Sequence, residues 1–515
     1  MMNRACRFRV ALVVVLALGV AGARAQGQTL PPGFVDERVV GGLTEGLAFA
    51  FLPDGRVLIA EKSGLVRVMK AGALLPVPFI DLRNRVNAYW DRGLLGIAAD
   101  PSFQSNGYVY LYYVYESGAN TFTGPKTARL TRVTAQGDTA NPATEIVLLG
   151  DTTASRCSSL PSGADCIPAD SPSHNGGAIR FASDGTLFLS TGDGAEWNIV
   201  DDNALRAQDL GSLAGKVLRV TPLGDGLPTN PFWTGNPGAN RSKVWAYGFR
   251  NPFRFGVRPL NDTPYVGDVG WNTWEEVNVA AGANYGWPCY EGTGRQSGYE
   301  PKALCQSLYA AGSGAVRPPI AVYPHNQQSA AVTGGAFYNG TAFPAEYQDA
   351  YFFGDYALGF ISYLHVDSTD ALIGSVQAFA SGVGGPVDIQ AGPDGALYYL
   401  AINAGELRRI RYSSTTPPPG AGPYLTDREW VSATNGWGPV ERDTSNGEQA
   451  AGDGGPITLN GKAYLRGLGV HAPSEIRYRI DAGCSGFVAD IGVDDEVGTN
   501  GSVRFEVLVD GIGAY

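Results

Sequence analysis

Three segments of this 515-residue chain repeat one short pattern, and this repeat constrains the fold more than any other feature. They are FLPDGRVLIAE at 51–61, FASDGTLFLST at 181–191 and AGPDGALYYLA at 391–401. In each segment Asp-Gly favours a tight hairpin turn, and the apolar run after it is typical of a strand buried on both faces. Similar units of turn and strand occur at 106–113 and 351–356. The pattern predicts an all-β domain.

Repeats of this kind, without helical periodicity, indicate a six-bladed β-propeller, whose radial blades leave only short sheet edges. Six blades would average about 65 residues, against roughly 40 to 45 in a compact blade, so we expect long inserted loops. The 70 glycines and 33 prolines fit a fold with many tight turns. A β-sandwich is the alternative for the same repeats.

A spacer divides the chain near residue 413. The stretch SSTTPPPG at 413–420 is typical of an extended, semi-rigid linker. We therefore expect a first domain at 26–412, a linker at 413–423 and a second domain at 424–515.

Residues 1–25 have the features of a secretory signal peptide. Arg4, Arg7 and Arg9 precede an apolar run at 10–20, and Ala-Arg-Ala at 23–25 fits a small-residue cleavage site. The run is too short to cross a bilayer of roughly 30 Å, and no later segment is continuously apolar enough to do so. We expect a secreted or periplasmic protein without a membrane span.

The cysteines fit an oxidising compartment. Cys157 and Cys166 bracket one loop, and Cys289 and Cys305 bracket another, which predicts two local disulfides and leaves Cys484 alone. A structural zinc site is disfavoured, because the chain has no CxxC pair and only four histidines. The net charge of −11 argues against a nucleic-acid partner and favours a small or neutral ligand.

Several collinear motifs run through the first domain. They are RGLLGIA at 92–98, SHNGG at 173–177, GKVLR at 215–219, GFRNP at 248–252, GDVGWNTWEEVN at 267–278, NYGWP at 284–288 and GGAFY at 334–338. Together they resemble the glucose/sorbosone dehydrogenase family over most of residues 32–412. The resemblance implies a six-bladed propeller. In the best-known members it also implies pyrroloquinoline quinone (PQQ), calcium and oxidation of a sugar at its anomeric carbon.

His174 is the candidate catalytic base. Removing hydride from a carbon that bears a hydroxyl requires a base for the hydroxyl proton, and histidine titrates nearest neutrality. His174 lies in a glycine-rich turn before a strand and aligns with the base of the family. The alternative is a loop histidine bonded to backbone. We interpret the acids at Asp193 and at 201–203 as parts of loop turns.

Arg250 and Asn251 are the candidate cofactor-binding residues. Their charged and amide donors suit a polarised quinone carbonyl, and the resemblance implies that they touch the cofactor. The alternative for Arg250 is a strand-end arginine paired to a carboxylate.

Four residues are candidate calcium ligands by the same resemblance. It assigns the backbone of Gly270 and Trp271 to the cofactor calcium, and the side chain of Glu276 with the carbonyl of Tyr285 to a second, structural calcium. Calcium takes six to eight oxygen ligands, often including backbone carbonyls. A merely solvated acidic turn is the alternative.

Two departures from the glucose-oxidising branch weaken the case for PQQ. Ser173 stands before the base, where that branch often has Asp. The stretch GDYALGF at 354–360 has no Lys or Arg to pair with the carboxylates of the quinone, which would lose several charge-assisted bonds. The patterns YPH at 323–325 and FGDY at 353–356 are closer to the branch that includes Hedgehog-interacting-protein-like propellers, some of which bind partners.

The second domain has its own collinear motifs: YLTD at 424–427, NGWGP at 435–439, GLGVHA at 467–472 and GVDDE at 492–496. They resemble the NPCBM family, a carbohydrate-binding-like module with a galactose-binding-like jelly-roll β-sandwich. In that family further strands follow the turn at 509–511, so we expect a partial sandwich, incomplete at its C-terminus. His471 and the acids at 494–496 could bind sugar or calcium, although the pattern around His471 favours a core strand.

These features lead to two hypotheses. The first is an exported, quinone-dependent sugar dehydrogenase in which His174 takes the hydroxyl proton and hydride passes to PQQ. An external electron acceptor would then reoxidise the quinone, and the second domain could hold a polysaccharide. The second hypothesis is a non-catalytic propeller that binds glycan or protein partners at the cell surface. A hydrolase is disfavoured, because the sequence has no GxSxG nucleophile elbow.

Overall fold

The computed structural model describes residues 6–10, 29–118, 122–412, 425–428, 430–447, 449–464, 466–478, 489–509 and 512–513. The chain separates into two compact units, Ala25–Ser414 and a second one made of Met1–Arg24 with Thr415–Tyr515. Each unit is described by itself. The expected linker, most of the expected signal peptide and Cys484 lie outside the described residues.

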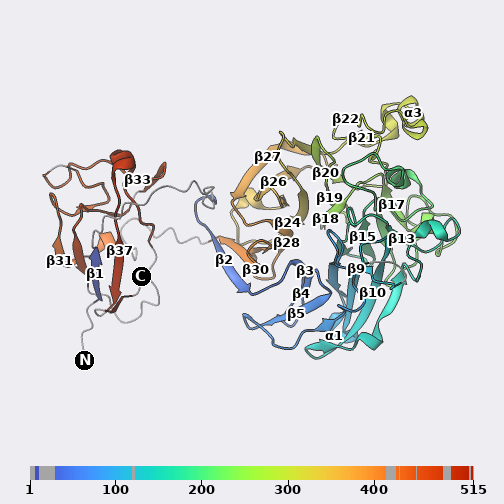
Figure 1. The fold of residues 1–515 in the computed structure, drawn as a ribbon, viewed down its shortest axis with the longest axis horizontal. Coiled ribbons are helices and arrows are strands. Elements are labelled where there is room, and N and C mark those ends of the chain that lie inside the picture. The colour runs from blue at the N-terminus through green and yellow to red at the C-terminus, as the bar shows by residue number, and fades with distance from the viewer. Residues whose placement is uncertain are drawn as a thin grey trace. The chain divides into compact units, whose positions relative to one another are not determined.

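The first unit is a ring of antiparallel sheets that follow one another along the chain (Figure 1). Blade 1 contains β3 (Gly46–Phe51), β4 (Val57–Glu61), β5 (Leu65–Lys70), β6 (Ala73–Leu74) and β7 (Ile80–Asp81). Blade 2 contains β8 (Leu94–Ala99), β9 (Tyr108–Tyr115), β10 (Lys126–Gln136), β11 (Thr139–Ala140), β12 (Ile146–Leu149) and β13 (Ile167–Ala169). Blade 3 contains β14 (Ile179–Phe181), β15 (Leu187–Thr191), β16 (Lys216–Val220) and β17 (Val244–Tyr247).

The remaining blades each have four strands. Blade 4 contains β18 (Pro252–Val257), β19 (Pro264–Asp268), β20 (Trp274–Val279) and β23 (Ala321–Pro324). Blade 5 contains β24 (Val332–Phe337), β25 (Tyr351–Asp355), β26 (Phe360–Val366) and β27 (Leu372–Ser381). Blade 6 contains β28 (Pro386–Ala391), β29 (Leu397–Ala401), β30 (Glu406–Tyr412) and, from the start of the propeller, β2 (Phe34–Gly41).

The ring closes through this last sheet. β2 pairs with β30 from Phe34 opposite Tyr412 to Gly41 opposite Glu406. The first strands of neighbouring blades also contact one another around the ring, including β28 with β3. The prediction of an all-β, six-bladed propeller is confirmed, and the β-sandwich alternative for this domain is wrong.

The three sequence repeats occupy equivalent places in their blades. Each Asp-Gly turn leads into the second strand of a sheet, namely β4, β15 and β29, and every residue of these strands is buried. Continuous burial is what their uninterrupted apolar runs predicted.

Charged side chains tie the innermost strands together across the ring. The Arg180 guanidinium on β14 bonds the Asp388 carboxylate on β28 at 2.7 Å, and the other oxygen of Asp388 accepts the Phe49 N–H from β3 at 3.1 Å. Arg254 on β18 donates to the Leu47 carbonyl of blade 1 at 2.7 Å. These bonds hold blades 1, 3, 4 and 6 in one rigid frame.

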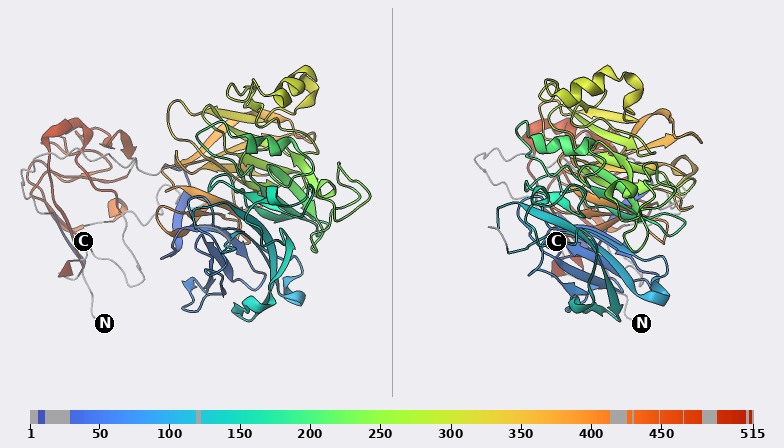
Figure 2. Two further views of the ribbon diagram at one scale, coloured as in Figure 1. Left: turned by 45° about the vertical axis from the view of Figure 1, so that its right-hand side comes forward. Right: turned by 90° about the vertical axis from the view of Figure 1, so that its right-hand side faces the viewer.

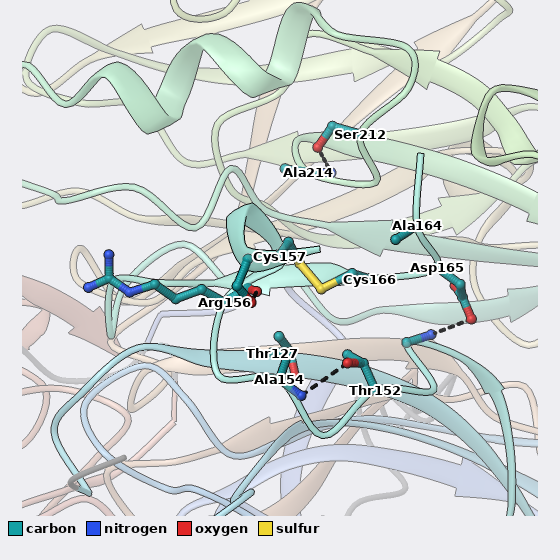
Figure 3. Close-up of a disulfide and its surroundings, with 12 residues drawn as sticks. Thr127, Thr152, Ala154, Arg156, Cys157, Ala164, Asp165, Cys166, Ser212 and Ala214 are labelled. Carbon is teal, nitrogen blue, oxygen red and sulfur yellow. Dashed lines mark hydrogen bonds between the residues drawn. A yellow bond between two sulfur atoms is a disulfide. The ribbon is translucent and has the colours of Figure 1, made fainter. Parts of the chain in front are cut away.

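Both predicted disulfides are confirmed. Cys157–Cys166 closes the loop between β12 and β13, and Cys289–Cys305 closes a loop inserted in blade 4. Beside the first disulfide, the Asp165 carboxylate accepts the Gly150 N–H at 3.1 Å (Figure 3). The disulfide therefore secures the segment that leads through β13 towards His174.

Helices are few and short. In the described part of the first unit they are α1 (Phe103–Asn106), α2 (Asn240–Lys243) and α3 (Ala303–Ala310), with 3₁₀ turns at Pro142–Thr144, Cys157–Ser159, Asp202–Gln208, Ser313–Ala315 and Ala345–Tyr347; the second unit has 3₁₀ turns at Leu425–Asp427 and Asp495–Asn500. α3 lies at the periphery of the propeller, near the hairpin of β21 (Tyr290–Glu291) and β22 (Gly294–Arg295) (Figures 1 and 2). Among the described residues, no helix is long and apolar enough to span a membrane.

The second unit is a small β module. Its main sheet has the order β31 (Trp430–Thr434), β36 (Glu475–Tyr478), β1 (Cys6–Val10), β37 (Phe505–Val509) and β38 (Ile512–Gly513). Two hairpin-sized sheets pair β32 (Glu441–Arg442) with β35 (Leu468–Gly469) and β33 (Ile457–Leu459) with β34 (Lys462–Tyr464). β1 falls within the expected signal peptide. His471 is exposed and follows β35, so its interpretation as a core-strand residue is wrong.

Candidate active site

His174 lies on the loop between β13 and β14, and its side chain is almost fully buried. Its backbone has φ +56°, in the left-handed region that costs energy for a residue with a Cβ. Two contacts hold this conformation. The Gly194 N–H donates to the His174 carbonyl at 3.1 Å, and a Cβ placed on Gly192 would lie 1.9 Å from that carbonyl oxygen, so only glycine fits at position 192.

Asp193 is the partner of His174, which corrects its interpretation as part of a loop turn. The imidazole Nδ1 lies 2.9 Å from Asp193 Oδ1, and the carboxylate is completely buried. The Ala195 N–H donates to the same oxygen at 2.8 Å, and the Trp287 indole N–H donates to Oδ2 at 2.7 Å. A carboxylate with these donors accepts a proton-bearing Nδ1, which leaves Nε2 as the basic nitrogen.

The electrostatics keep His174 neutral. Burial lowers the pKa of His174 and the nearby Arg250 charge lowers it further, while Asp193 opposes this only in part. Burial alone would raise the pKa of Asp193, but its interactions with His174 and then Arg250 hold it below its usual value. Among the described residues, no group bonds His174 Nε2. The arrangement is a buried, oriented general base.

Arg250 and Asn251 follow β17 and share one carboxylate through their backbones. Asp268 accepts the Arg250 N–H at 3.0 Å and the Asn251 N–H at 2.7 Å. The Asn251 side-chain oxygen accepts the Gly176 N–H at 3.0 Å, two residues after His174. The structure therefore brings Asn251 and the His174 loop together.

The Arg250 side chain is buried and is held by neutral groups. Its Nη1 donates to the carbonyls of Val269 and Gly270, at 3.1 and 2.7 Å, and the guanidinium lies 5.5 Å from the centre of the Trp287 ring. Its Nε has no partner in the described part of the chain. The alternative of a side-chain pair with a carboxylate is therefore not what the structure shows.

The structure separates the four candidate calcium ligands into two groups. The Gly270 carbonyl faces Arg250, and the Trp271 N–H donates at 3.0 Å to Glu291. Glu276 lies on β20, where its carboxylate accepts from the side chain of Asn278 and from the backbone of Gly292. The Tyr285 hydroxyl bonds the backbone of blade 4 at Ala281 and, closely, at Val279. Among the described residues, no hydrogen bond joins Glu276 to Tyr285.

The surroundings of Glu276 suit a cation. Burial raises the pKa of its carboxyl, and the neighbouring Asp268 raises it further. The Asn278 Oδ1 beside it is buried and has no partner among the described residues. Calcium prefers such oxygens. Within the described ranges, however, no three acids, histidines or cysteines converge on one point.

A quinone fits these residues only in part. Arg250 and Asn251 offer donors beside the base, which fits the carbonyl end of the group. For the carboxylate end, the stretch between Arg317 and Arg408 offers no charged partner, because it contains no Lys or Arg. Three arginines on β30 form ion pairs with acids, namely Arg408, Arg409 and Arg411 with Asp36, Glu37, Asp394 and Glu406.

Sequence reasoning missed three residues of this site: Asp193, Asp268 and Trp287. Asp193 could have been found, because Gly-Asp-Gly at 192–194 directly follows a strand with five apolar or small residues, at the end where the site lies. Nothing in the sequence pairs Asp268 with two backbone N–H groups 17 and 18 residues away.

Comparisons with known proteins agree with this fold. The chain is 29% identical to aldose sugar dehydrogenase YliI of Escherichia coli over 379 residues, which cover 70% of this chain and 89% of that protein. The crystal structure of the soluble aldose sugar dehydrogenase of Escherichia coli, in the apo-form, has a TM-score of 0.59 at 25% identity and covers 74% of this chain and 99% of that chain.

A shorter stretch of the chain has a separate relative. Over 99 residues, the chain is 50% identical to a Renibacterium salmoninarum protein described as "Putative endo-alpha-N-acetylgalactosaminidase", which is 19% of this chain and only 7% of that protein. The NPCBM/NEW2 domain family matches residues 422–515. The second unit is thus a carbohydrate-binding type of β module.

The glucose/sorbosone dehydrogenase family matches residues 43–409, which span nearly the whole propeller. The His174–Asp193 pair, Arg250 and Asn251 all lie within that match. The chain therefore belongs to the glucose/sorbosone dehydrogenase family.

Proposed function

We propose that the protein oxidises an aldose or related sugar at its anomeric carbon, with His174 as base and a quinone of the PQQ type as acceptor. One observation carries the proposal: in the part of the chain that the structure describes, the buried His174–Asp193 pair leaves Nε2 without a partner, beside the buried Arg250 guanidinium. A neutral imidazole held in one tautomer is the group that alcohol oxidation requires.

Each residue of the site has a separate role in this reaction. Asp193 holds the Nδ1 proton, so that the Nε2 lone pair takes the proton of the anomeric hydroxyl. The resulting imidazolium is stabilised by the Asp193 carboxylate at 2.9 Å. Trp287 and Ala195 keep that carboxylate in place. A bound quinone would supply the acceptor for the hydride that leaves the same carbon, and the sugar becomes the lactone.

Arg250 and Asn251 would hold the quinone. Because Asp268 fixes both backbones, their side-chain donors are oriented before the cofactor binds. Calcium would bind at the carbonyls of Gly270 and Trp271, and a second ion at Glu276 and the Tyr285 carbonyl. The first ion would supply positive charge where the acceptor becomes negative.

The basic and apolar segment at residues 1–25 supports a location outside the cytoplasm. We propose a secreted or periplasmic enzyme whose NPCBM domain binds polysaccharide and whose turnover would require an external electron acceptor. The sugar substrate is neutral on this proposal, in keeping with the acidic charge balance of the chain.

The test is a titration of the full chain with PQQ and calcium, followed by aldoses with a dye acceptor. We expect a protein-bound quinone absorbance and sugar-dependent dye reduction. His174→Ala should keep the absorbance and lose the dye reduction, because it removes the base and leaves Arg250 and Asn251. Absence of both signals in the unmodified protein would overturn the proposal.

A second candidate function is a propeller that binds glycan or protein without redox chemistry. The absence of Lys and Arg between Arg317 and Arg408 favours it, because the PQQ carboxylates would find no cation in that stretch. Under this alternative the titration gives no quinone signal, while glycans still bind.

A further inference from the structure

Two tryptophans stand exposed on neighbouring loops of the propeller. Trp90 is 51% exposed and Trp197 is 46% exposed. Their ring centres lie 6.2 Å apart, with 34° between the ring planes. Most other aromatic contacts of the propeller are buried in the blades, whereas these two rings present large apolar faces to solvent.

Both tryptophans belong to loops that carry the His174 site. Trp90 precedes Asp91, whose N–H donates at 3.2 Å to the carbonyl of Pro172, two residues before the base. Trp197 follows Asp193, the partner of His174, by four residues. The pair therefore stands at the rim of the site.

Arg206 fixes the Trp197 loop to the loop that carries His174, and the Asp91 N–H bond to Pro172 fixes the Trp90 loop to that same loop. Its Nη1 bonds the Asp170 carboxylate closely, and its Nη2 donates to the Asp193 carbonyl at 3.0 Å. Trp90 itself has φ +54°, a conformation that disfavours a bulky residue. The exposed pair is therefore held in place on rigid loops, which reduces the entropy lost when a ligand binds.

The indoles of Trp90 and Trp197 and the carboxylates near them favour one class of ligand. A pyranose ring has an apolar C–H face that can cover an indole and an edge of hydroxyls that need acceptors. Carboxylates lie on the same loops, at Asp91 and Glu196, with Asp201 and Asp202 following. They can accept bonds from hydroxyls, and they would repel a uronate chain. The rim thus suits a neutral saccharide.

We propose that Trp90 and Trp197 form a subsite for the second and following residues of a neutral oligosaccharide whose reducing-end sugar sits at His174. This inference rests on the proposed function for the place of the reducing end. It assigns oligosaccharide ends, and not only free monosaccharides, as the substrate class.

The experiment compares three forms of the full chain: unmodified, Trp90→Ala with Trp197→Ala, and Leu260→Ala. Leu260 is 68% exposed on the β18–β19 turn and serves as a matched control for loss of an exposed apolar side chain. Calorimetry measures the binding of glucose, maltopentaose, cellopentaose and a pentagalacturonate. The second unit is identical in all three forms, so its own sugar binding cancels in the comparison.

We expect at least one neutral pentasaccharide to bind the unmodified chain more tightly than glucose, and the pentagalacturonate to bind more weakly. The double variant should bind that pentasaccharide about tenfold or more weakly, the usual result of truncating anchoring aromatic rings. Leu260→Ala should bind as the unmodified chain does. Equal affinity in the double variant and the unmodified chain, or no preference for a pentasaccharide over glucose, would overturn the subsite.

Measurements of sugar oxidation distinguish a failure of the subsite from a failure of the proposed function. If the PQQ-loaded protein oxidises sugars, the ratio of kcat/KM for pentasaccharide to that for glucose should fall in the double variant. If it oxidises none, the proposed function fails, and the calorimetric difference alone decides whether the aromatic subsite exists.

Discussion

Replacing Asp193 with asparagine is the sharpest perturbation of the proposed mechanism. Asp193 Oδ1 accepts the His174 Nδ1 proton at 2.9 Å and the Ala195 N–H at 2.8 Å, while Oδ2 accepts the Trp287 indole N–H at 2.7 Å. An amide has one acceptor oxygen and one donor nitrogen. In either orientation, Asp193→Asn therefore turns a donor towards a donor.

The size of the effect follows from these contacts. A hydrogen bond to a charged group contributes about 1.5 to 3 kcal/mol, or roughly a tenfold to 150-fold change in rate if it is made fully in the transition state. If the amide nitrogen faces Nδ1, the imidazole must also carry its proton on Nε2, where it can no longer act as base. We therefore expect kcat to fall by about a hundredfold or more.

The pH dependence of kcat/KM gives a second test of the role of Asp193. The base must be neutral, and burial with the Arg250 charge places the pKa of His174 below 6.5, so the acidic limb of kcat/KM should lie below pH 6.5. Because Asp193 raises this pKa, Asp193→Asn should move the limb to lower pH. The chain has only four histidines, so NMR titration of the imidazoles can follow His174 without any turnover.

Asp54→Asn is the matched control. Asp54 is an exposed turn acid that pairs with Arg56, and its loss should leave kcat and the pKa of His174 unchanged. A His174 pKa at or above 6.5 in the unmodified protein would refute the electrostatic argument. An Asp193→Asn variant with normal kcat would refute the role of His174 as base.

Two further predictions concern calcium and the first disulfide. Calcium should raise the melting temperature of the unmodified protein more than that of Glu276→Gln. This increase in melting temperature should grow as pH rises, because the ion must displace a proton from a carboxyl whose pKa burial raises. Equal increases in the two proteins, measured by thermal unfolding, would contradict the assignment of Glu276. Replacing Cys157 and Cys166 by serine should lower the free energy of unfolding by about 2 to 3 kcal/mol, measured in guanidinium. The reason is that a cross-link over a sequence separation of nine residues no longer restricts the unfolded chain. An unchanged unfolding midpoint would contradict this prediction.

The sequence was most informative where structure is local. The Asp-Gly turns at 54–55, 184–185 and 394–395 are followed by buried strands, because turn geometry and an apolar run suffice to define such a unit. The two disulfides were predictable for the same reason, since each joins cysteines close in sequence.

The sequence was least informative for contacts that form only when the propeller ring has closed. The Arg180–Asp388 pair joins residues 208 apart in sequence, and nothing near either one indicates the other. The role of Asp193 was missed because a glycine-flanked acid also suits a turn. Its burial and its bond to His174 exist only once β14 and β15 have brought residues 174 and 193 together.

The β2–β30 pairing also has a consequence for biosynthesis. β2 is the first propeller strand to leave the ribosome, and its only partner in the sheet is among the last. Until Glu406–Tyr412 has been made, Phe34–Gly41 is an unpaired strand that could join the sheet of another nascent chain. Closure of this propeller therefore waits until β30 has left the ribosome, and chaperone dependence should end only when the whole first domain has been synthesised.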